Sequence, residues 1–187
     1  MDLYDIITQA ISIIAMTTYI ISYSLKQKKT IIFFQCIATV FFAISFAMLG
    51  AIMGCILNVI SAIRAVLFLY KDKLKTDNKI WLVGFLTLYA VIYVLVFTVF
   101  GKEFSLTNAI IELLPIIGMV ATTFGFRAKT TTGVRIGGLI NEPVWFVYNI
   151  ISHSSGAILS NIFSIFSICF GLIRDKKGKN NQTKNLS

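Results

Sequence analysis

The chain has 187 residues, of which 57% are hydrophobic and only 13% are charged. A soluble domain of this length has too little interior to hide so much apolar surface, so the composition excludes a soluble protein and indicates an integral membrane protein. The formal net charge of +9 would suit a nucleic-acid-binding protein, but the basic residues lie in short clusters at the ends of apolar stretches, where they orient a membrane protein.

Seven apolar stretches are long enough to cross a bilayer, which takes about 20 helical residues. They cover residues 5–24, 31–50, 52–70, 80–100, 106–126, 136–152 and 156–173. We therefore expect an all-α membrane fold with short loops and antiparallel neighbouring helices. The first nine residues hold two acidic residues and no basic residue, so we expect a retained span and not a cleaved signal peptide.

The basic residues alternate between the predicted loops. Fifteen Lys or Arg residues follow the first, third, fifth and seventh stretches, and only Lys102 lies in the loops on the other side. Because cytoplasmic loops carry the excess of basic residues, we expect the C-terminus in the cytoplasm and the N-terminus outside. Seven spans keep this alternation, and six would break it.

The two halves of the chain resemble each other at an offset of 103 residues. From Gln9 to Lys73, ten of 65 pairs are identical, and polar pairs such as Asn58 with Asn161 weigh most because polar residues are scarce in apolar helices. An odd linker span inserts both halves in the same sense, so we expect two parallel three-helix bundles joined by a linker helix, a 3+1+3 arrangement. The expected units are the first bundle, the linker with its loops, the second bundle and a polar cytoplasmic tail, at residues 1–73, 74–105, 106–176 and 177–187.

Three ionisable side chains are expected at membrane depth: Arg64, Glu112 and Glu142. Each costs about 3 kcal/mol there, so each needs a partner or a role. Arg64 and Glu142 lie about two turns from the cytoplasmic ends of their spans, which predicts an ion pair, either structural or coupled to transport. Glu112 lies in the outer half of its span and is a candidate for binding a solute or a proton. Arg64 also takes the position of Ser167 in the repeat, so a charge breaks the symmetry there.

Asn58 and Asn161 occupy matching positions in the third helix of each predicted bundle. Two amides related by a pseudo-twofold axis would bind a polar solute from both sides; the alternative is that both are hydrogen bonds between helices. Trp145 is predicted to wall the same cavity, with a membrane-interface anchor as the alternative. Pro115 and Pro143 lie inside spans, where we expect a kink or a hinge.

Catalytic and metal-binding patterns are missing from the sequence. It holds no serine nucleophile elbow, no His-Glu-x-x-His and no phosphate-binding loop. Cys36, Cys55 and Cys169 all lie in apolar stretches, without metal-site or disulfide spacing, and are interpreted as packing residues. The sequence therefore predicts no enzyme, no cofactor and no metal.

Two motifs carry a resemblance to a known family. The run from Glu112 to Gly118, and Leu57 and Asn58 followed by Ala62 to Arg64, look like the YgjV family of bacterial inner-membrane proteins, and the resemblance covers nearly the whole chain. More distantly, the chain is similar to the PQ-loop and SWEET group of triple-helix-bundle proteins, which includes carriers of sugars, amino acids and vitamin precursors. In SWEET-type carriers, asparagines on the third helix of each bundle bind the sugar, and Asn58 and Asn161 match those positions.

The leading hypothesis is a small-solute carrier or facilitator of the bacterial inner membrane, with alternating access to a polar site at the midplane. The alternative is a non-transporting membrane protein, such as a receptor, an immunity factor or an assembly factor. A central polar cavity reached by Asn58, Asn161 and Glu112 would favour the carrier. A closed apolar core with Arg64 and Glu142 locked together would favour the alternative. The bilayer and a small polar solute are the expected partners, and association with a second copy is left open.

Overall fold

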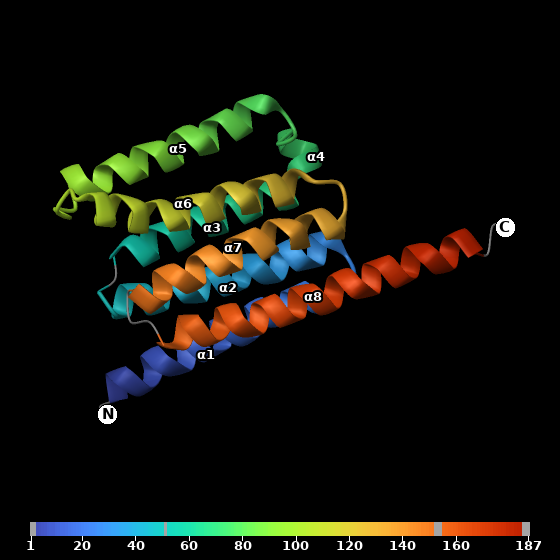
Figure 1. Ribbon diagram of the computed structural model, residues 1–187, viewed down its shortest axis with the longest axis horizontal. Helices are drawn as coiled ribbons and strands as arrows, with labels where there is room; N and C mark the ends of the chain where they lie inside the picture. The colour runs from blue at the N-terminus through green and yellow to red at the C-terminus, as the bar shows by residue number, and fades with distance from the viewer. Residues whose placement is uncertain (1–2, 51, 152–154, 185–187) are drawn as a thin grey trace.

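The computed structural model describes residues 3–50, 52–151 and 155–184, and in this part of the chain it contains eight helices and no strand. The seven long helices are α1 (Leu3–Ser24), α2 (Lys28–Met48), α3 (Ile52–Leu69), α5 (Lys79–Thr98), α6 (Leu106–Arg127), α7 (Thr131–Ile151) and α8 (Ser155–Lys184). α4 (Lys71–Leu74) is a single turn between α3 and α5. The long helices lie roughly along the long axis of the molecule, and the last turns of α8 project beyond the others (Figure 1). The predicted all-α fold is confirmed.

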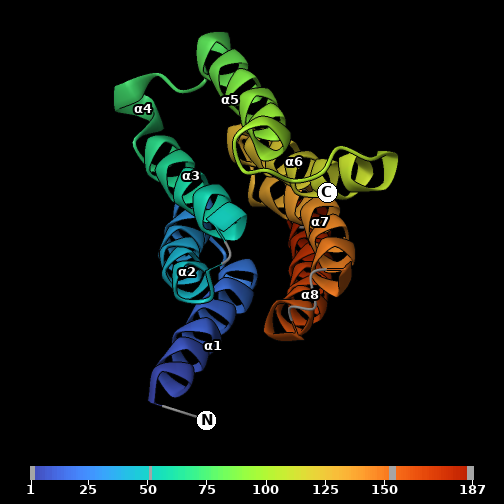
Figure 2. The ribbon, with the colours of Figure 1, turned by 90° about the vertical axis from the view of Figure 1, so that its left-hand side faces the viewer.

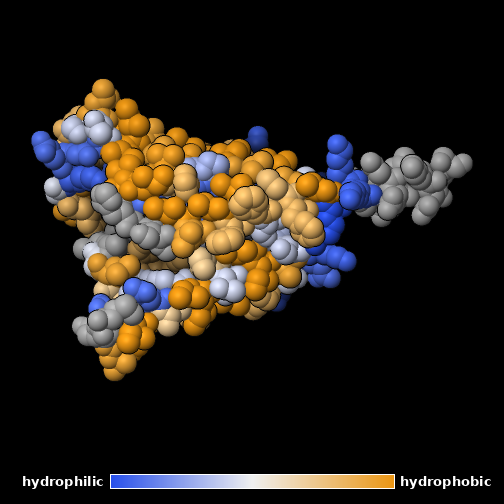
Figure 3. All heavy atoms as spheres, turned by 60° about the horizontal axis from the view of Figure 1, so that its bottom comes forward, coloured by the Kyte–Doolittle hydropathy of each residue, from blue (hydrophilic) through white to orange (hydrophobic). Residues whose placement is uncertain are grey.

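Five helices in the described part of the chain are long and apolar enough to cross a membrane: α1, α2, α5, α6 and the Ala157–Lys177 part of α8. α3 contributes a shorter apolar segment, Gly54–Leu69. α7 has the length but is less apolar, and it is absent from the five. Most of the outer surface is apolar, with hydrophilic side chains gathered toward its two ends (Figure 3). These five helices imply contact with a lipid bilayer, and they are fewer than the seven predicted spans.

The long helices pack in two groups of three. α2 packs against both α1 and α3, and α7 packs against both α6 and α8. Figure 2 shows the first group (α1, α2 and α3) on one side and the second group (α6, α7 and α8) on the other. The groups meet where α1 packs on α8 and, more sparsely, where α3 packs on α6; we call these contacts the α1–α8 seam and the α3–α6 seam. α5 packs beside α6.

The bundle has two chemically different ends. We call the end where α1, α3, α6 and α8 begin the N-terminal end. The opposite end holds the α1–α2, α3–α5 and α6–α7 connections, with their clustered Lys and Arg residues, and we call it the basic end.

Glycines bring α6 and α7 close together. A side chain added at Gly137 of α7 would meet the carbonyl oxygen of Ala121 at 2.7 Å and the Cα of Gly125 at 3.1 Å. Small residues at such contacts let two helix backbones approach within van der Waals range, which is how helices associate in lipid. Ser105 caps the start of α6, and its hydroxyl accepts a hydrogen bond from the backbone N–H of Asn108 at 3.1 Å. α7 is therefore held against α6 along its first half.

α7 carries a buried polar face. Arg135, Glu142 and Asn149 follow one another at intervals of seven residues, which puts them on one side of a helix, and their exposed fractions are 0%, 1% and 4%. α7 is the central helix of its group, so most of this face contacts protein and not lipid. This position explains why α7 is less apolar than its neighbours although it has their length.

An aromatic cluster joins α3, α5 and α6. The ring of Phe68 lies 6.3 Å from that of Phe85 and 5.9 Å from that of Phe126, and Tyr89 stacks on Phe85. All four side chains are buried. Ring pairs at these spacings stabilise the contact beyond the area they bury. The cluster holds the part of α3 that carries Arg64.

Candidate functional site

A cavity of about 90 Å³ lies between the two groups. Most of its exposed wall area is apolar, although twelve of its nineteen lining residues carry a polar side chain, and it has room for several water molecules. The polar lining residues are Tyr19, Gln35, Thr39, Asn58, Ser61, Arg64, Thr122, Asn141, Glu142, Asn149, Ser160 and Asn161. The apolar ones are Phe42, Phe46, Ala65, Met119, Phe126, Trp145 and Ala157. Six helices, three from each group, therefore share one polar cavity.

The cavity reaches the N-terminal end of the bundle. Phe46 and Asn149 lie within two residues of the last residues of α2 and α7, and Ala157 lies two residues after the start of α8. Figure 2 views the molecule from this end, with one group on each side. The lining continues inward to Arg64 and Phe126. The loops of the basic end contribute nothing to it.

Arg64 reaches from α3 to α5 and α6. Its Nη1 donates to the carbonyl oxygen of Met119 at 2.8 Å and to the hydroxyls of Tyr89 and Thr123, both at 3.1 Å. Its guanidinium carbon lies 5.1 Å from the centre of the Phe126 ring, within range of a cation–π interaction. The side chain is only 4% exposed, and its Nε has no hydrogen-bond partner. Arg64 is thus a buried cation held by neutral groups.

Glu142 is held by amides. The Nδ2 of Asn141 donates to its Oε1 at 3.0 Å, and the Nδ2 of Asn161 donates to its Oε2 at 2.8 Å. Asn149 extends the chain by donating to the Oδ1 of Asn161 at 2.9 Å. No Lys or Arg nitrogen among the described side chains lies within 4.0 Å of the Glu142 carboxylate. The hydroxyls of Tyr19 and Tyr23 also interact with this group, so Glu142 is a buried carboxyl group that is also held by neutral groups.

The direct ion pair predicted between Arg64 and Glu142 is not present in the described part of the structure. Both side chains line the cavity, but each turns to neutral partners on its own side. The physical reason is that α6 offers Arg64 a carbonyl and a hydroxyl, and α5 a second hydroxyl, at hydrogen-bonding distance, whereas neighbouring Asn side chains donate to Glu142. The region between the two side chains is a cavity with polar residues in its wall.

The other predicted solute residues divide into two sets. Asn58, Asn161 and Trp145 line the cavity, but Glu112 does not. The Glu112 carboxylate is buried and forms an ion pair with Lys102, at the N-terminal end of α6. The structure therefore separates Glu112 from the site predicted for it, because the α5–α6 connection brings Lys102 back onto α6.

The two asparagines differ in how they are bonded. The amide of Asn58 is half-buried and donates to the carbonyl oxygen of Gly54 in its own helix at 2.8 Å. The amide of Asn161 is buried and bonded within the second group. Both amides line one cavity, but each forms its hydrogen bonds within its own group. Their present contacts therefore do not show two amides arranged to bind one sugar directly.

The prolines interrupt neither helix. Pro115 lies inside α6 and is buried, and Pro143 lies inside α7, next to Glu142, and is exposed. Each removes one helical hydrogen bond. Whether either is a hinge stays a prediction.

Sequence reasoning missed Gln35. Its side chain is 4% exposed, lines the cavity and has an Nε2 without a hydrogen-bond partner. The sequence of its helix is plainly apolar, so the polar pair in it was overlooked. Gln35 and Thr39 are one turn apart on one face of α2, and they line the same cavity as Asn141 and Glu142 of α7. Among the described side chains, no three His, Cys, Asp or Glu residues gather where they could hold a metal ion.

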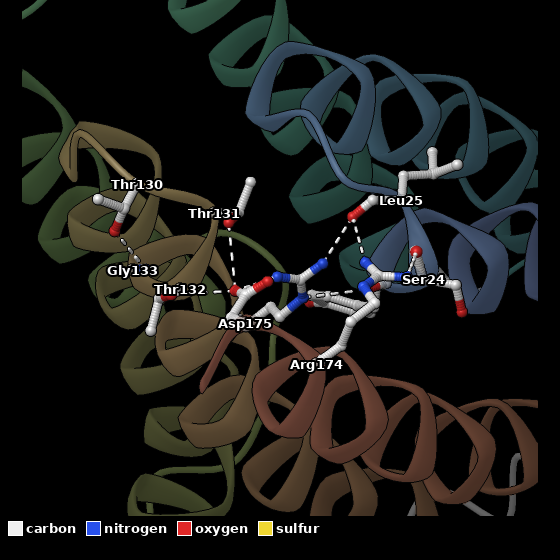
Figure 4. A network of polar contacts seen from close by, with 10 residues as sticks. Ser24, Leu25, Thr130, Thr131, Thr132, Gly133, Arg174 and Asp175 are labelled. Atoms are coloured by element: carbon white, nitrogen blue, oxygen red, sulfur yellow. Dashed lines mark hydrogen bonds and ion pairs between the residues drawn. The ribbon is translucent and has the colours of Figure 1, made fainter. Parts of the chain in front are cut away.

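The basic end joins the two groups through charged side chains. Arg135 of α7 forms an ion pair with Asp175, and donates to the carbonyl oxygens of Tyr23 at 3.1 Å and Leu25 at 2.6 Å. Asp175 also accepts hydrogen bonds from two threonines at the start of α7, while Arg174 points to the carbonyls at the end of α1 (Figure 4). These carbonyls lack helical partners, so the cations cap α1 and tie it to the second group.

A second cap is formed by a residue of the first group on a helix of the second group. Lys28, at the start of α2, donates to the carbonyl oxygens of Phe126 at 2.6 Å and Ala128, at the end of α6. The hydrogen bonds that join the two groups lie on the last turns of α1 and on the second half of α6. In the described part of the chain, the groups are thus bonded together in the half of the bundle nearer the basic end.

Comparison with known protein families agrees with this picture. A family model described as a bacterial inner membrane protein, Imp-YgjV, matches residues 6–179. No match was found among curated proteins or among solved structures. The resemblance to the YgjV family is confirmed, and the more distant likeness to the SWEET group stays a prediction. The chain belongs to the Imp-YgjV family of bacterial inner membrane proteins.

Proposed function

We propose that the protein is a small-solute carrier or facilitator, with seven spans arranged as two three-helix bundles joined by α5. The observation that supports this best is the polar cavity between the two groups, with lining residues from both. Buried charges and amides are costly in a membrane and usually mark a path for a solute, an ion or water. We assign Asn58, Asn161 and Trp145 to the solute site, and no chemical step to any residue.

The contacts at the two seams support an internal repeat. Ser167 of α8 donates to the carbonyl oxygen of Ile20 in α1 at 2.8 Å. Arg64 of α3 donates to the hydroxyl of Thr123 in α6 at 3.1 Å. At the offset of 103 residues, Arg64 corresponds to Ser167 and Ile20 to Thr123. Equivalent positions therefore meet equivalent positions across the interface, as expected for two units related by a pseudo-twofold axis along the membrane normal.

α3 and α7 complete the seven spans in this proposal. The 21 residues of α7 have a helical length of about 31 Å, close to the ~30 Å of the hydrocarbon core. α3, with 18 residues, has a length of about 27 Å and lies alongside its neighbours (Figure 1). A central helix shielded by its group has less need of an apolar surface, so the lower hydropathy of α7 does not argue against a span.

The excess of basic residues indicates that the basic end is cytoplasmic. The cavity would then open toward the outside, and the caps made by Lys28 and Arg135 would close the cytoplasmic side. Alternating access would need these contacts to open as the groups rock about the cavity, with Pro115 and Pro143 as hinges. The repeat units are residues 1–73 and 106–176, with 74–105 as the linker and 177–187 as the cytoplasmic tail.

Uptake by purified protein in liposomes tests the proposal. We expect saturable uptake of at least one member of a panel of sugars, amino acids and vitamin precursors, measured with and without a pH gradient. Asn58→Leu should reduce that uptake at least tenfold. Val59→Leu should leave it unchanged, because Val59 lies one residue further along α3 and is 43% exposed on the outer surface.

Two outcomes would contradict the proposal that the protein is a carrier. Folded protein that takes up no solute in the panel would support the non-transporting alternative, a receptor, immunity factor or assembly factor. Equal effects of Asn58→Leu and Val59→Leu would show that the cavity is not the path. Melting temperatures of both variants in detergent check that they fold.

A further inference from the structure

The cavity contains two opposite charges that do not touch each other. Arg64, from the first group, is 4% exposed, and Glu142, from the second group, is 1% exposed. In the described part of the chain, neither side chain has an ion-pair partner within 4.0 Å. A buried charge without a counter-charge is unfavourable unless something else neutralises it. A ligand between them that carries both charges would neutralise the two at once.

The Arg64 side of the cavity needs an acceptor. Its Nη1 makes all the hydrogen bonds that the guanidinium forms with described residues, so the edge formed by Nε and Nη2 has no partner among them. That edge presents two parallel N–H groups, which match the two oxygens of a carboxylate. The Nε2 of Gln35, a second buried donor without a partner, lines the same cavity. Both unused groups are donors, and a carboxylate would satisfy them.

The Glu142 side needs a donor. The carboxyl group has amide donors from Asn141 and Asn161, and the hydroxyls of Tyr19 and Tyr23 also interact with it. All of these partners are neutral, so none of them compensates a negative charge on Glu142. An ammonium group that replaces one of the hydroxyls would supply a donor and the compensating charge.

The rest of the wall sets the size and character of the ligand. Phe42, Phe46 and Trp145 give the cavity aromatic surface between the two charges and its N-terminal opening. A volume of about 90 Å³ suits a small molecule. We propose that this site binds a small zwitterionic solute of the amino-acid type, with its carboxylate on the Nε–Nη2 edge of Arg64 and its ammonium on Glu142. This inference rests on the proposed function only in taking the cavity as the solute site.

Binding to the full-length protein in detergent, measured by calorimetry, tests the charge requirement. The probes are alanine, alaninamide (ammonium only), propionate (carboxylate only) and glucose (uncharged). We expect alanine to bind at least tenfold more tightly than the other three. A series from glycine through β-alanine to 4-aminobutyrate separates the two charges stepwise, so the best binder in it reports the span between Arg64 and Glu142.

Variants assign each charge to its residue. Arg64→Met should bind alanine no better than alaninamide, and Glu142→Gln should bind it no better than propionate. Arg64→Lys keeps the charge without the paired N–H groups and should weaken alanine binding while still favouring it over alaninamide. Phe163→Leu, on the outer surface of α8, is the control and should change nothing. Should Arg64→Met fail to fold, Arg64→Lys and the wild-type panel still decide the matter.

Three results would overturn the inference: glucose binding as tightly as alanine, equal binding of alanine and its singly charged analogues, or no binding of any zwitterion by protein with a native melting transition. The first would leave a solute site for a neutral ligand, and the proposed function would stand. Conversely, charge-dependent alanine binding without uptake into liposomes would reject the carrier and leave the site intact.

Discussion

The two seams between the groups differ at positions that are equivalent in the proposed repeat. At the α1–α8 seam, α8 presents Ser160, Ser164, Ser167 and Gly171, all buried, and the helices pack closely. At the α3–α6 seam, Arg64 stands where α8 has Ser167, and the helices make fewer contacts. A small hydroxyl lets two helices close on each other, whereas a guanidinium needs room and brings a charge. In the proposed repeat, an arginine in place of a serine would thus turn a packed seam into part of the wall of the cavity.

The caps at the basic end show the same kind of difference. The carbonyls at the end of α1 are capped by Arg135, and the equivalent carbonyls at the end of α6 are capped by Lys28. Arg135 is fully buried and has Asp175 as a counter-ion, whereas Lys28 is half-buried and has no ion-pair partner within 4.0 Å among the described residues. At the basic end, the closure on the α1 side should therefore be the stronger one.

The largest expected effect comes from filling the space between α8 and Arg135 of α7. Gly171 of α8 lies against Arg135, and a Cβ at that position would overlap the guanidinium. Gly171→Leu should displace Arg135 and lower the free energy of unfolding by about 3–5 kcal/mol, enough to abolish folded protein. The matched control is Gly84→Leu, since Gly84 has open space around it and should tolerate the side chain. Similar yields of both variants in the membrane would contradict this close contact of α8 with Arg135.

The next effect compares the two caps. Arg135→Met leaves the Asp175 carboxylate and the α1 carbonyls without their cation, and we expect it to cost about 3 kcal/mol. Lys28→Met removes a half-buried cation with no counter-ion, and we expect about 1 kcal/mol. Thermal unfolding in detergent measures both. An equal loss in the two variants would show that the caps are equivalent after all.

A double-mutant cycle sharpens the account of Arg64. Because Arg64 bonds to Thr123 and not to Glu142, Arg64→Met and Thr123→Val should be coupled by about 1 kcal/mol in stability. Coupling of Arg64→Met with Glu142→Gln should be smaller, below about 0.5 kcal/mol. A larger coupling energy between Arg64 and Glu142 than between Arg64 and Thr123 would instead support the direct ion pair expected from the sequence.

The smallest effect separates two serines on the same helix face. Ser167→Ala loses the bond to the Ile20 carbonyl and should cost about 0.6 kcal/mol, the average for such bonds in membranes. Ser164 is fully buried, but its hydroxyl has no partner, so Ser164→Ala should be neutral or slightly stabilising. Melting temperatures that fall equally in both would mean that Ser164 has a partner in the membrane.

Much of this arrangement follows from sequence alone. Hydropathy finds the long helices, and the repeat at 103 residues pairs Asn58 with Asn161, both of which line the cavity. The partners of individual side chains are harder to predict, because the depth of a residue in the membrane does not determine which neighbouring helix its side chain faces. Arg64 and Glu142 have similar depth, yet Arg64 meets Tyr89 of α5, a contact that only the packing of α3, α5 and α6 creates.

Two further residues show why local pattern was insufficient. Glu112 reads as a free intramembrane acid, but a connection that folds back puts Lys102 beside it. Gln35 is hidden in an apolar helix, and its importance depends on the lack of a partner in the folded protein. Both facts depend on contacts between different segments of the folded chain, and hydropathy and residue spacing do not predict such contacts.

Water access to the cavity tests the central claim most directly. In a background with Cys36, Cys55 and Cys169 replaced by Ala, single Asn58→Cys and Val59→Cys variants are exposed to a membrane-impermeant maleimide in right-side-out and inside-out vesicles. The two positions have the same depth on α3, but Asn58 lines the cavity and Val59 faces outward. The account predicts that Asn58→Cys reacts in right-side-out vesicles while Val59→Cys stays unmodified in both. Labelling of Asn58→Cys only in inside-out vesicles, or of neither variant, would contradict a polar cavity that opens to the outside.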